Sequence, residues 1–112
     1  MRCFLSGYDI QRGQYSREHF YPKSKLPYYL QNEKSNIFPA IKIFNSIKGD
    51  LLPCEWYDVW QERCYSALQR YRLKPSERRY VKRLLETGLP EMNPCDFCLG
   101  FKYHFLCKKY QR

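Results

Sequence analysis

The chain has 112 residues, a length that suits one compact domain with one hydrophobic core and leaves no room for a second large domain. Twenty Lys and Arg against eleven Asp and Glu give a formal net charge of +9, which favours polyanionic partners, nucleic acid first. The first residues contain no apolar run of the length that a secretory signal or a membrane span needs, so we expect an intracellular protein of the cytoplasm or an organelle, without a membrane partner.

The first third of the chain alternates short mixed segments with turn residues. Residues 2–20 include Gly7 and Gly13 and favour two short strands joined by a loop, with His19 at a strand end. Residues 21–35 hold two prolines among Lys and Tyr residues, a composition typical of an extended basic loop, and we expect no helix there.

Two helices are predicted next. Asn36 can cap a short, largely apolar helix that ends at Gly49, because Asn is a favoured N-cap and Gly a favoured C-terminal breaker. A second helix is predicted after Pro53, where apolar residues recur at helical spacing. That apolar stripe consists of Trp56, Val59, Trp60, Ala67, Leu68 and Tyr71.

A third helix and an irregular tail complete the chain. Pro75 suits a first helical turn, and Gly88 suits the end of the helix. The basic residues between them are expected on the outer face of this helix. From Pro90 onward the chain is rich in cysteine and shows no helical or strand periodicity.

The most informative pattern starts at residues 16–24, which read Ser-Arg-Glu-His-Phe-Tyr-Pro-Lys-Ser and are followed by Asn36, by Asn45 and by Lys-Gly-Asp at residues 48–50. In this order and spacing the pattern resembles the HNH endonuclease family, over roughly the first half of the chain. The resemblance implies a small ββα-metal core in residues 1–53. With the two later helices and the Cys-rich tail of residues 54–112 packed against it as one domain, we expect an α+β fold.

The same resemblance implies a metal-dependent endonuclease that hydrolyses phosphodiester bonds in DNA or RNA. His19 matches the general base that takes a proton from the attacking water. Glu18 and Asn45 match the two metal-ligand positions, and their oxygen atoms suit Mg²⁺, with Mn²⁺ or Ni²⁺ as substitutes. Asn36 matches the middle Asn of the family's catalytic motif, which orients the loop.

Four basic side chains are candidate contacts to the phosphates of nucleic acid. They are Arg17, Lys23, Lys25 and Lys48. For Arg17 and Lys48 a solvated surface charge is an equally good interpretation. Lys48 lies one helical turn beyond Asn45 in the predicted helix.

A second function fits the size, the tyrosine content and the positive charge equally well. The chain can be an HNH-derived module without catalysis that binds RNA within a larger nucleoprotein complex, such as an organellar ribosome. The joint presence of Glu18, His19 and Asn45 favours the enzyme, because a purely structural descendant has no chemical reason to keep all three.

In many members of the family a structural zinc ion, held by two Cys pairs, stabilises this fold. Here Cys3 is present, but Ser6, Ile41 and Phe44 stand at the other three positions, so that zinc is lost. We expect Ile41 and Phe44 to pack under the hairpin instead, which stabilises the fold by about 1.5 to 3 kcal/mol per buried side chain.

A different cluster in the tail predicts a structural zinc site. Its four nitrogen and sulfur ligands are Cys95, Cys98, His104 and Cys107. One Cys-x2-Cys pair and one His-x2-Cys pair are enough for a closed tetrahedral site. Buried free thiols with a surface His are the competing interpretation, and Cys54 or Cys3 could replace His104 as a ligand.

Overall fold

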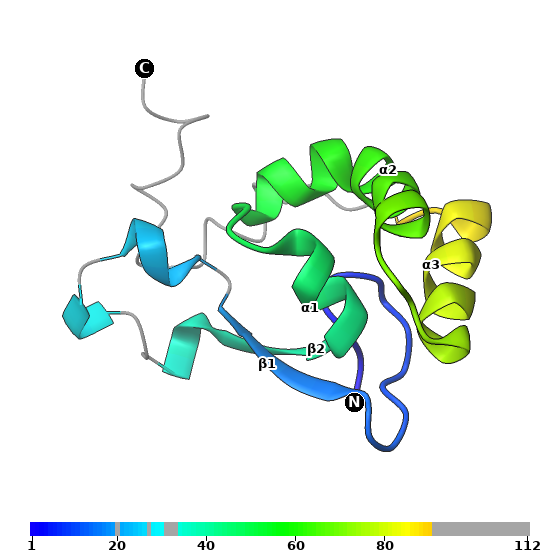
Figure 1. The fold of residues 1–112 in the computed structure, drawn as a ribbon. Coiled ribbons are helices and arrows are strands. Elements are labelled where there is room, and N and C mark those ends of the chain that lie inside the picture. The colour runs from blue at the N-terminus through cyan, green and yellow to red at the C-terminus, as the bar shows by residue number, and fades with distance from the viewer. Residues whose placement is uncertain (20, 27, 31–33, 91–112) are drawn as a thin grey trace.

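The computed structural model describes residues 1–19, 21–26, 28–30 and 34–90. Figure 1 shows a two-stranded sheet below one short helix, with two longer helices forming the other end of the molecule. The elements in chain order are β1 (Tyr15–His19), η1 (Lys23–Lys25), η2 (Tyr28–Leu30), η3 (Lys34–Asn36), β2 (Ile37–Ile41), α1 (Lys42–Lys48), α2 (Pro53–Arg70) and α3 (Pro75–Thr87). The predicted α+β class is confirmed, and no helix among the described residues is long and apolar enough to cross a membrane.

The partner of β1 is β2, which follows the long loop, and the two strands run antiparallel from Tyr15 opposite Ile41 to His19 opposite Ile37. The prediction of two strands within residues 2–20 is therefore wrong. The residues before β1 contribute one isolated bridge, between Arg2 and Asp9. The chain turns back too sharply there for a longer ladder, because the Gly7 N–H donates to the Cys3 carbonyl at 2.7 Å.

The helix predicted from Asn36 begins only at Lys42, because residues 37–41 are extended as β2. Ile, Phe and a second Ile suit a strand, and Pro39 is tolerated because both strands of a two-stranded sheet are edges. The helix ends at Gly49 as predicted, with a positive φ of 54°. The prediction that residues 21–35 contain no helix is also wrong, since three single turns of 3-10 helix, the last ending at Asn36, interrupt this loop.

The second and third helices are confirmed, and both begin with a proline. Each has a glutamate in its first turn whose carboxylate accepts a backbone N–H. Glu55 accepts from Leu52 and Glu77 accepts from Lys74, both at 2.8 Å. These bonds satisfy N–H groups that a helix start leaves without partners.

Phe44 of α1 lies at the centre of the core and is fully buried. Its ring contacts Tyr8 of the N-terminal segment and Tyr80 of α3, with centroids 6.4 and 6.2 Å away. The buried cluster around it draws on both halves of the chain: Cys3, Leu5, Ala40, Ile41, Ile43, Phe44, Ile47, Trp56, Cys64, Ala67, Val81 and Leu84. The predicted burial of Ile41 and Phe44 is confirmed, and α1 therefore holds the sheet against the two longer helices.

Replacing Phe44 with Ala should lower the free energy of unfolding by about 3 to 5 kcal/mol, because the change leaves a cavity where three segments meet. Urea denaturation measures this loss. Tyr28→Ala is the control, because that ring is 88% exposed and its loss should cost within about 0.5 kcal/mol. Equal losses for the two variants would contradict the central place of Phe44.

Candidate functional site

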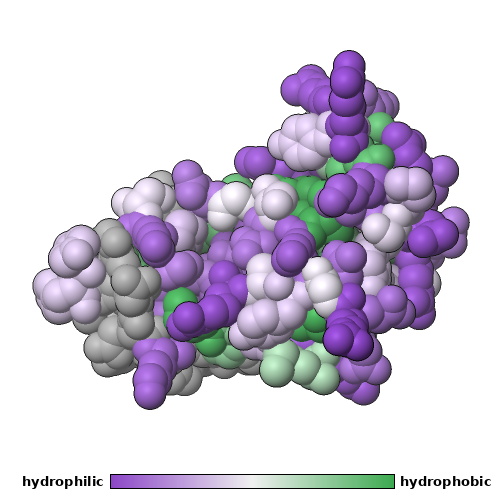
Figure 2. Space-filling view, turned by 60° about the horizontal axis from the view of Figure 1, so that its bottom comes forward, coloured by the Kyte–Doolittle hydropathy of each residue, from purple (hydrophilic) through white to green (hydrophobic). Residues whose placement is uncertain are grey.

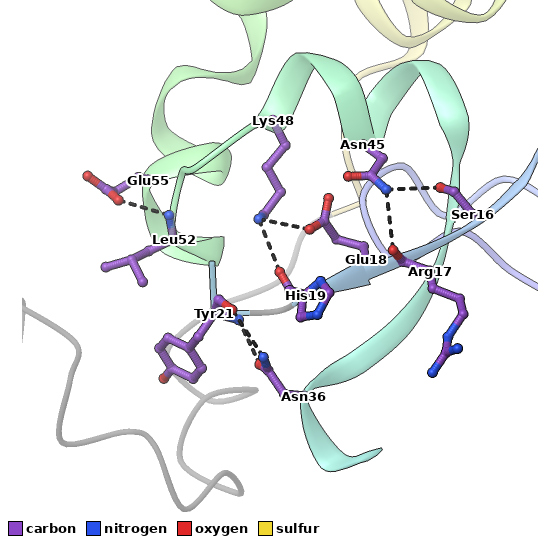
Figure 3. Close-up of polar contacts among 10 residues, drawn as sticks. All are labelled: Ser16, Arg17, Glu18, His19, Tyr21, Asn36, Asn45, Lys48, Leu52 and Glu55. Atoms are coloured by element: carbon purple, nitrogen blue, oxygen red, sulfur yellow. Dashed lines mark hydrogen bonds and ion pairs between the residues drawn. The ribbon is translucent and has the colours of Figure 1, made fainter. Parts of the chain in front are cut away.

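The candidate site lies where the end of β1 faces α1. Side chains alternate along a strand, and in β1 this alternation exposes Arg17 and buries Glu18, which is 5% exposed. His19 is half-buried at the strand end, as predicted. Figure 3 shows Glu18, Asn45 and Lys48 in the space between β1 and α1.

Lys48 is the most unexpected member of this group, because its side chain is fully buried. Its ammonium lies 3.6 Å from Glu18 Oε1 and donates a hydrogen bond to the His19 carbonyl at 3.4 Å. Burial contradicts the interpretation of Lys48 as a solvated surface charge. The Lys48 side chain points toward Glu18 and not toward solvent. The prediction that Lys48 contacts phosphate at the surface is therefore wrong.

The Glu18 carboxylate is only partly satisfied by this ion pair. Burial raises its pKa above the ordinary value, and this effect outweighs the opposing attraction of Lys48. Asp50 also raises the pKa, to a smaller extent. Glu18 Oε2 is buried and has no hydrogen-bond partner among the described residues. An unpaired buried acceptor is costly, so this oxygen is suited to a cation or a further donor.

Asn45 is oriented by hydrogen bonds from its amide nitrogen. That nitrogen donates to Ser16 Oγ at 3.1 Å and to the Arg17 carbonyl at 3.5 Å. Ser16 Oγ in turn donates to the Ala40 carbonyl at 3.0 Å, which links α1, β1 and β2. With the nitrogen directed to β1, the amide oxygen of Asn45 points to the side where Glu18 lies (Figure 3).

Asn36 lies on the other side of His19 and is fully buried. Its side chain forms two hydrogen bonds with the backbone of Tyr21. Asn36 Oδ1 accepts from the Tyr21 N–H at 2.8 Å, and Asn36 Nδ2 donates to the Tyr21 carbonyl at 3.0 Å. The amide therefore ties the two ends of the loop together, which is the arrangement expected of a loop-orienting residue.

The structure describes the side chains of three of the four predicted phosphate contacts, Arg17, Lys23 and Lys48. Arg17 and Lys23 are exposed, whereas the side chain of Lys25 lies outside the described residues. Tyr28 and Tyr29, which were not among the predicted site residues, are 88% and 78% exposed at the tip of the loop. Two adjacent tyrosines within a basic loop were the available signal, since exposed rings can stack on unpaired bases.

The burial of Lys48 was also missed, although a sequence signal existed. Lys48 lies four residues after Phe44 and next to Ile47, so it falls on the apolar face of its helix. A lysine in that position requires a buried acidic partner, and Glu18 at the end of β1 supplies it.

The family's zinc positions hold no metal ligands beyond Cys3. Cys3, Ser6, Ile41 and Phe44 are all buried, and Cys3 Sγ accepts a hydrogen bond from the Ile41 N–H at 3.2 Å. Cys54 is buried and is not in a disulfide. Among the described residues no group of three or more His, Cys, Asp or Glu side chains could hold a metal ion. The tail with Cys95, Cys98, His104 and Cys107 lies outside the described residues.

No protein-family model matches the sequence, and no curated protein and no solved structure matches it either. The resemblance to the HNH family therefore rests on the motif residues of the sequence alone.

Replacing Lys48 with Met should lower the free energy of unfolding by about 3 to 5 kcal/mol at neutral pH, because it leaves the Glu18 carboxylate buried without its cation. Lys42→Met is the matched control, since Lys42 is exposed at the start of the same helix and should cost within about 0.5 kcal/mol. The double variant Glu18→Gln with Lys48→Met should recover most of the loss in urea denaturation.

The loss should also depend on pH. The raised pKa means that the folded chain holds the Glu18 proton more tightly than the unfolded chain does. The stability from this proton is therefore present below the unfolded pKa and is lost as the pH rises through the folded one. Without Lys48 the pKa rises further, so the deficit of Lys48→Met should shrink on acidification. A deficit that is independent of pH would contradict the buried ion pair.

Proposed function

We propose that the chain is a metal-dependent endonuclease of the HNH type, which hydrolyses phosphodiester bonds in nucleic acid. One observation carries this proposal. Beside His19, a buried Glu18 oxygen lacks a hydrogen-bond partner among the described residues, and the amide oxygen of Asn45 points to the same side. A base, a carboxylate and an amide oxygen brought together where β1 faces α1 suit metal-assisted phosphodiester cleavage.

The residues present fit a hard divalent cation. Glu18 and Asn45 offer oxygen ligands, and the Asn45 amide nitrogen is already committed to Ser16 and Arg17. Two protein ligands are typical for Mg²⁺, which keeps several waters and binds substrate phosphates. When bound, Mg²⁺, or Mn²⁺ or Ni²⁺ in its place, stabilises the negative charge that develops on the scissile phosphate and the leaving oxygen.

His19 is the residue we assign to proton transfer from the attacking water. Its backbone carbonyl accepts from the Lys48 ammonium, and the backbone two residues later is held by Asn36. These two anchors hold the backbone at His19 and two residues after it, which helps a general base to stay within hydrogen-bond reach of the proton. Arg17 and Lys23 are exposed and can contact phosphates of the same substrate.

A catalytically silent RNA-binding module is the second candidate. The observation that favours it is the Glu18–Lys48 ion pair, in which a lysine already supplies positive charge to the carboxylate. Tyr28 and Tyr29 could then stack on unpaired bases of an RNA within a larger nucleoprotein complex. This candidate predicts binding without cleavage.

His19→Ala should reduce metal-dependent nicking of a plasmid by about a hundredfold or more, because the water then has no base. Binding to the same DNA in EDTA should be nearly unchanged. Gln11→Ala is the control, since Gln11 is exposed outside the site, and it should nick as the wild-type chain does.

Titration of the protein with Mn²⁺ tests the ligand assignment separately. Asn45→Ala should lose Mn²⁺ binding, and Asn45→Asp should keep it because a carboxylate replaces the amide oxygen. If the wild-type chain cleaves no DNA or RNA with Mg²⁺, Mn²⁺ or Ni²⁺ while it still binds RNA, the silent module is the correct function.

We also propose that the tail binds one structural zinc ion through Cys95, Cys98, His104 and Cys107, on the spacing of these residues alone. Elemental analysis of protein purified without chelator should then find about one zinc per chain. The double variant Cys95→Ser and Cys98→Ser should lose it, and Cys64→Ser, which alters a buried thiol of α2, should not. Zinc-free wild-type protein would leave free thiols as the better interpretation.

A further inference from the structure

The outer face of α3 concentrates positive charge far from His19 in the fold. Val81 and Leu84 are buried and turn this helix toward the core. Four exposed cations lie on the opposite side: Arg78, Arg79, Lys82 and Arg83. At 3.6 residues per turn they cover an arc of about 140° around the helix axis, and exposed Glu86, four residues after Lys82, falls within the same arc. In Figure 1, α3 lies at the end of the molecule opposite the loop that carries η1 and η2. We call this set of four residues the basic face.

The basic face is unfavourable for the isolated helix. Arg78 and Lys82 are four residues apart, as are Arg79 and Arg83, and like charges at this spacing repel one another. Within the part of the chain that the structure describes, Arg78, Arg79 and Lys82 form no ion pair. Arg83 has a cation–π contact, because its guanidinium lies 4.7 Å from the centroid of the Tyr8 ring.

The neighbouring helix shows that solvent exposure alone does not produce such a face. α2 carries three acidic residues and only two arginines, whereas α3 carries four basic and two acidic residues. The exposed residues of α2 include Asp58 and Glu62. In Figure 2, which keeps this end of the molecule on the right, many of the surface residues there are strongly hydrophilic. By composition, the positive charge of the two long helices is concentrated on α3.

We propose that the basic face docks α3 into the major groove of duplex DNA and holds the substrate by its phosphates. The B-form major groove is about 12 Å wide and admits an α-helix, and cations on both flanks of the helix can reach the phosphates of both strands. The major groove of duplex RNA is too deep and narrow for this arrangement. The inference rests on the proposed function for its substrate, and it adds a docking surface separate from the His19 site.

The test compares two triple variants that lose the same charge. One is Arg78→Gln with Arg79→Gln and Lys82→Gln, which spares Arg83 and its contact with Tyr8. The control is Arg12→Gln with Arg63→Gln and Arg70→Gln, three exposed arginines outside α3. Fluorescence anisotropy of a short labelled DNA duplex in EDTA, over a range of salt concentrations, gives the affinity without cleavage.

The α3 variant should bind about tenfold or more weakly at low salt, and the slope of log K against log salt should fall by about 2 to 3, close to 0.9 for each lost phosphate contact. The control variant should change affinity less than about threefold. The unfolding midpoint of the α3 variant should be nearly unchanged, because the loss of like-charge repulsion offsets the loss of the cation four residues before Glu86. Equal weakening in both triple variants would show a general charge effect and overturn the proposal.

A measurement on the wild-type chain covers the case in which the α3 variant does not fold. In NMR titrations with unlabelled duplex DNA, amide shifts should concentrate at residues 78–83 and not along α2. Shifts elsewhere only, or α3-dependent binding to duplex RNA or phosphatidylserine vesicles but not to duplex DNA, would overturn the proposal. Binding is measured in EDTA and is therefore independent of cleavage. DNA binding that depends on α3, without plasmid nicking in the separate assay, would overturn the proposed nuclease but not the docking surface. Plasmid nicking with DNA binding that does not depend on α3 would overturn the docking surface but not the nuclease.

Discussion

The buried pair of Glu18 and Lys48 is the constraint on which the arrangement of the site depends. Lys48 is fully buried at 3.6 Å from the carboxylate, so β1 and α1 must keep these two residues opposite each other. A buried ion pair adds little net stability, but the loss of one partner is costly, and the pair therefore selects one register of helix against strand. Because Lys48 also donates to the His19 carbonyl, the same contact positions the proposed base.

One face of α1 packs into the core, and another face carries residues of the candidate site. Phe44 and Ile47 pack into the shared core, while Asn45 is directed to β1 by its bond to Ser16. A helix of seven residues is too short to be stable alone, so its place is set by these contacts and by the stop at Gly49. The site is consequently only as rigid as the core beneath it, and a cavity at Phe44 would disturb Asn45 and Lys48 together.

Local signals in the sequence were enough for α2, α3, the helix end at Gly49 and the place of His19 at a strand end. They failed for residues 37–41, because a short apolar run after Asn36 suits a helix or a buried strand equally well and its pairing partner lies before a long loop. The side chain of Asn36 is used by the Tyr21 backbone and not as a helix cap. In the site, His19, Glu18 and Asn45 were found from the motif. The apolar-face position of Lys48 indicated its burial, but its partner Glu18 could not be identified from local signals, because the pair joins distant segments.

Glu18 separates the two candidate functions in physical terms. One of its oxygens faces Lys48, and the other is buried with no hydrogen-bond partner in the described part of the chain. In a silent module this second oxygen is an uncompensated cost, which substitution by an apolar residue together with Lys48 would remove. In a nuclease the same oxygen has a use, since a divalent cation offsets the burial of the carboxylate and gains a ligand. The burial of this carboxyl group beside His19, with one oxygen left without a partner among the described residues, is therefore the physical reason to favour the proposed catalysis.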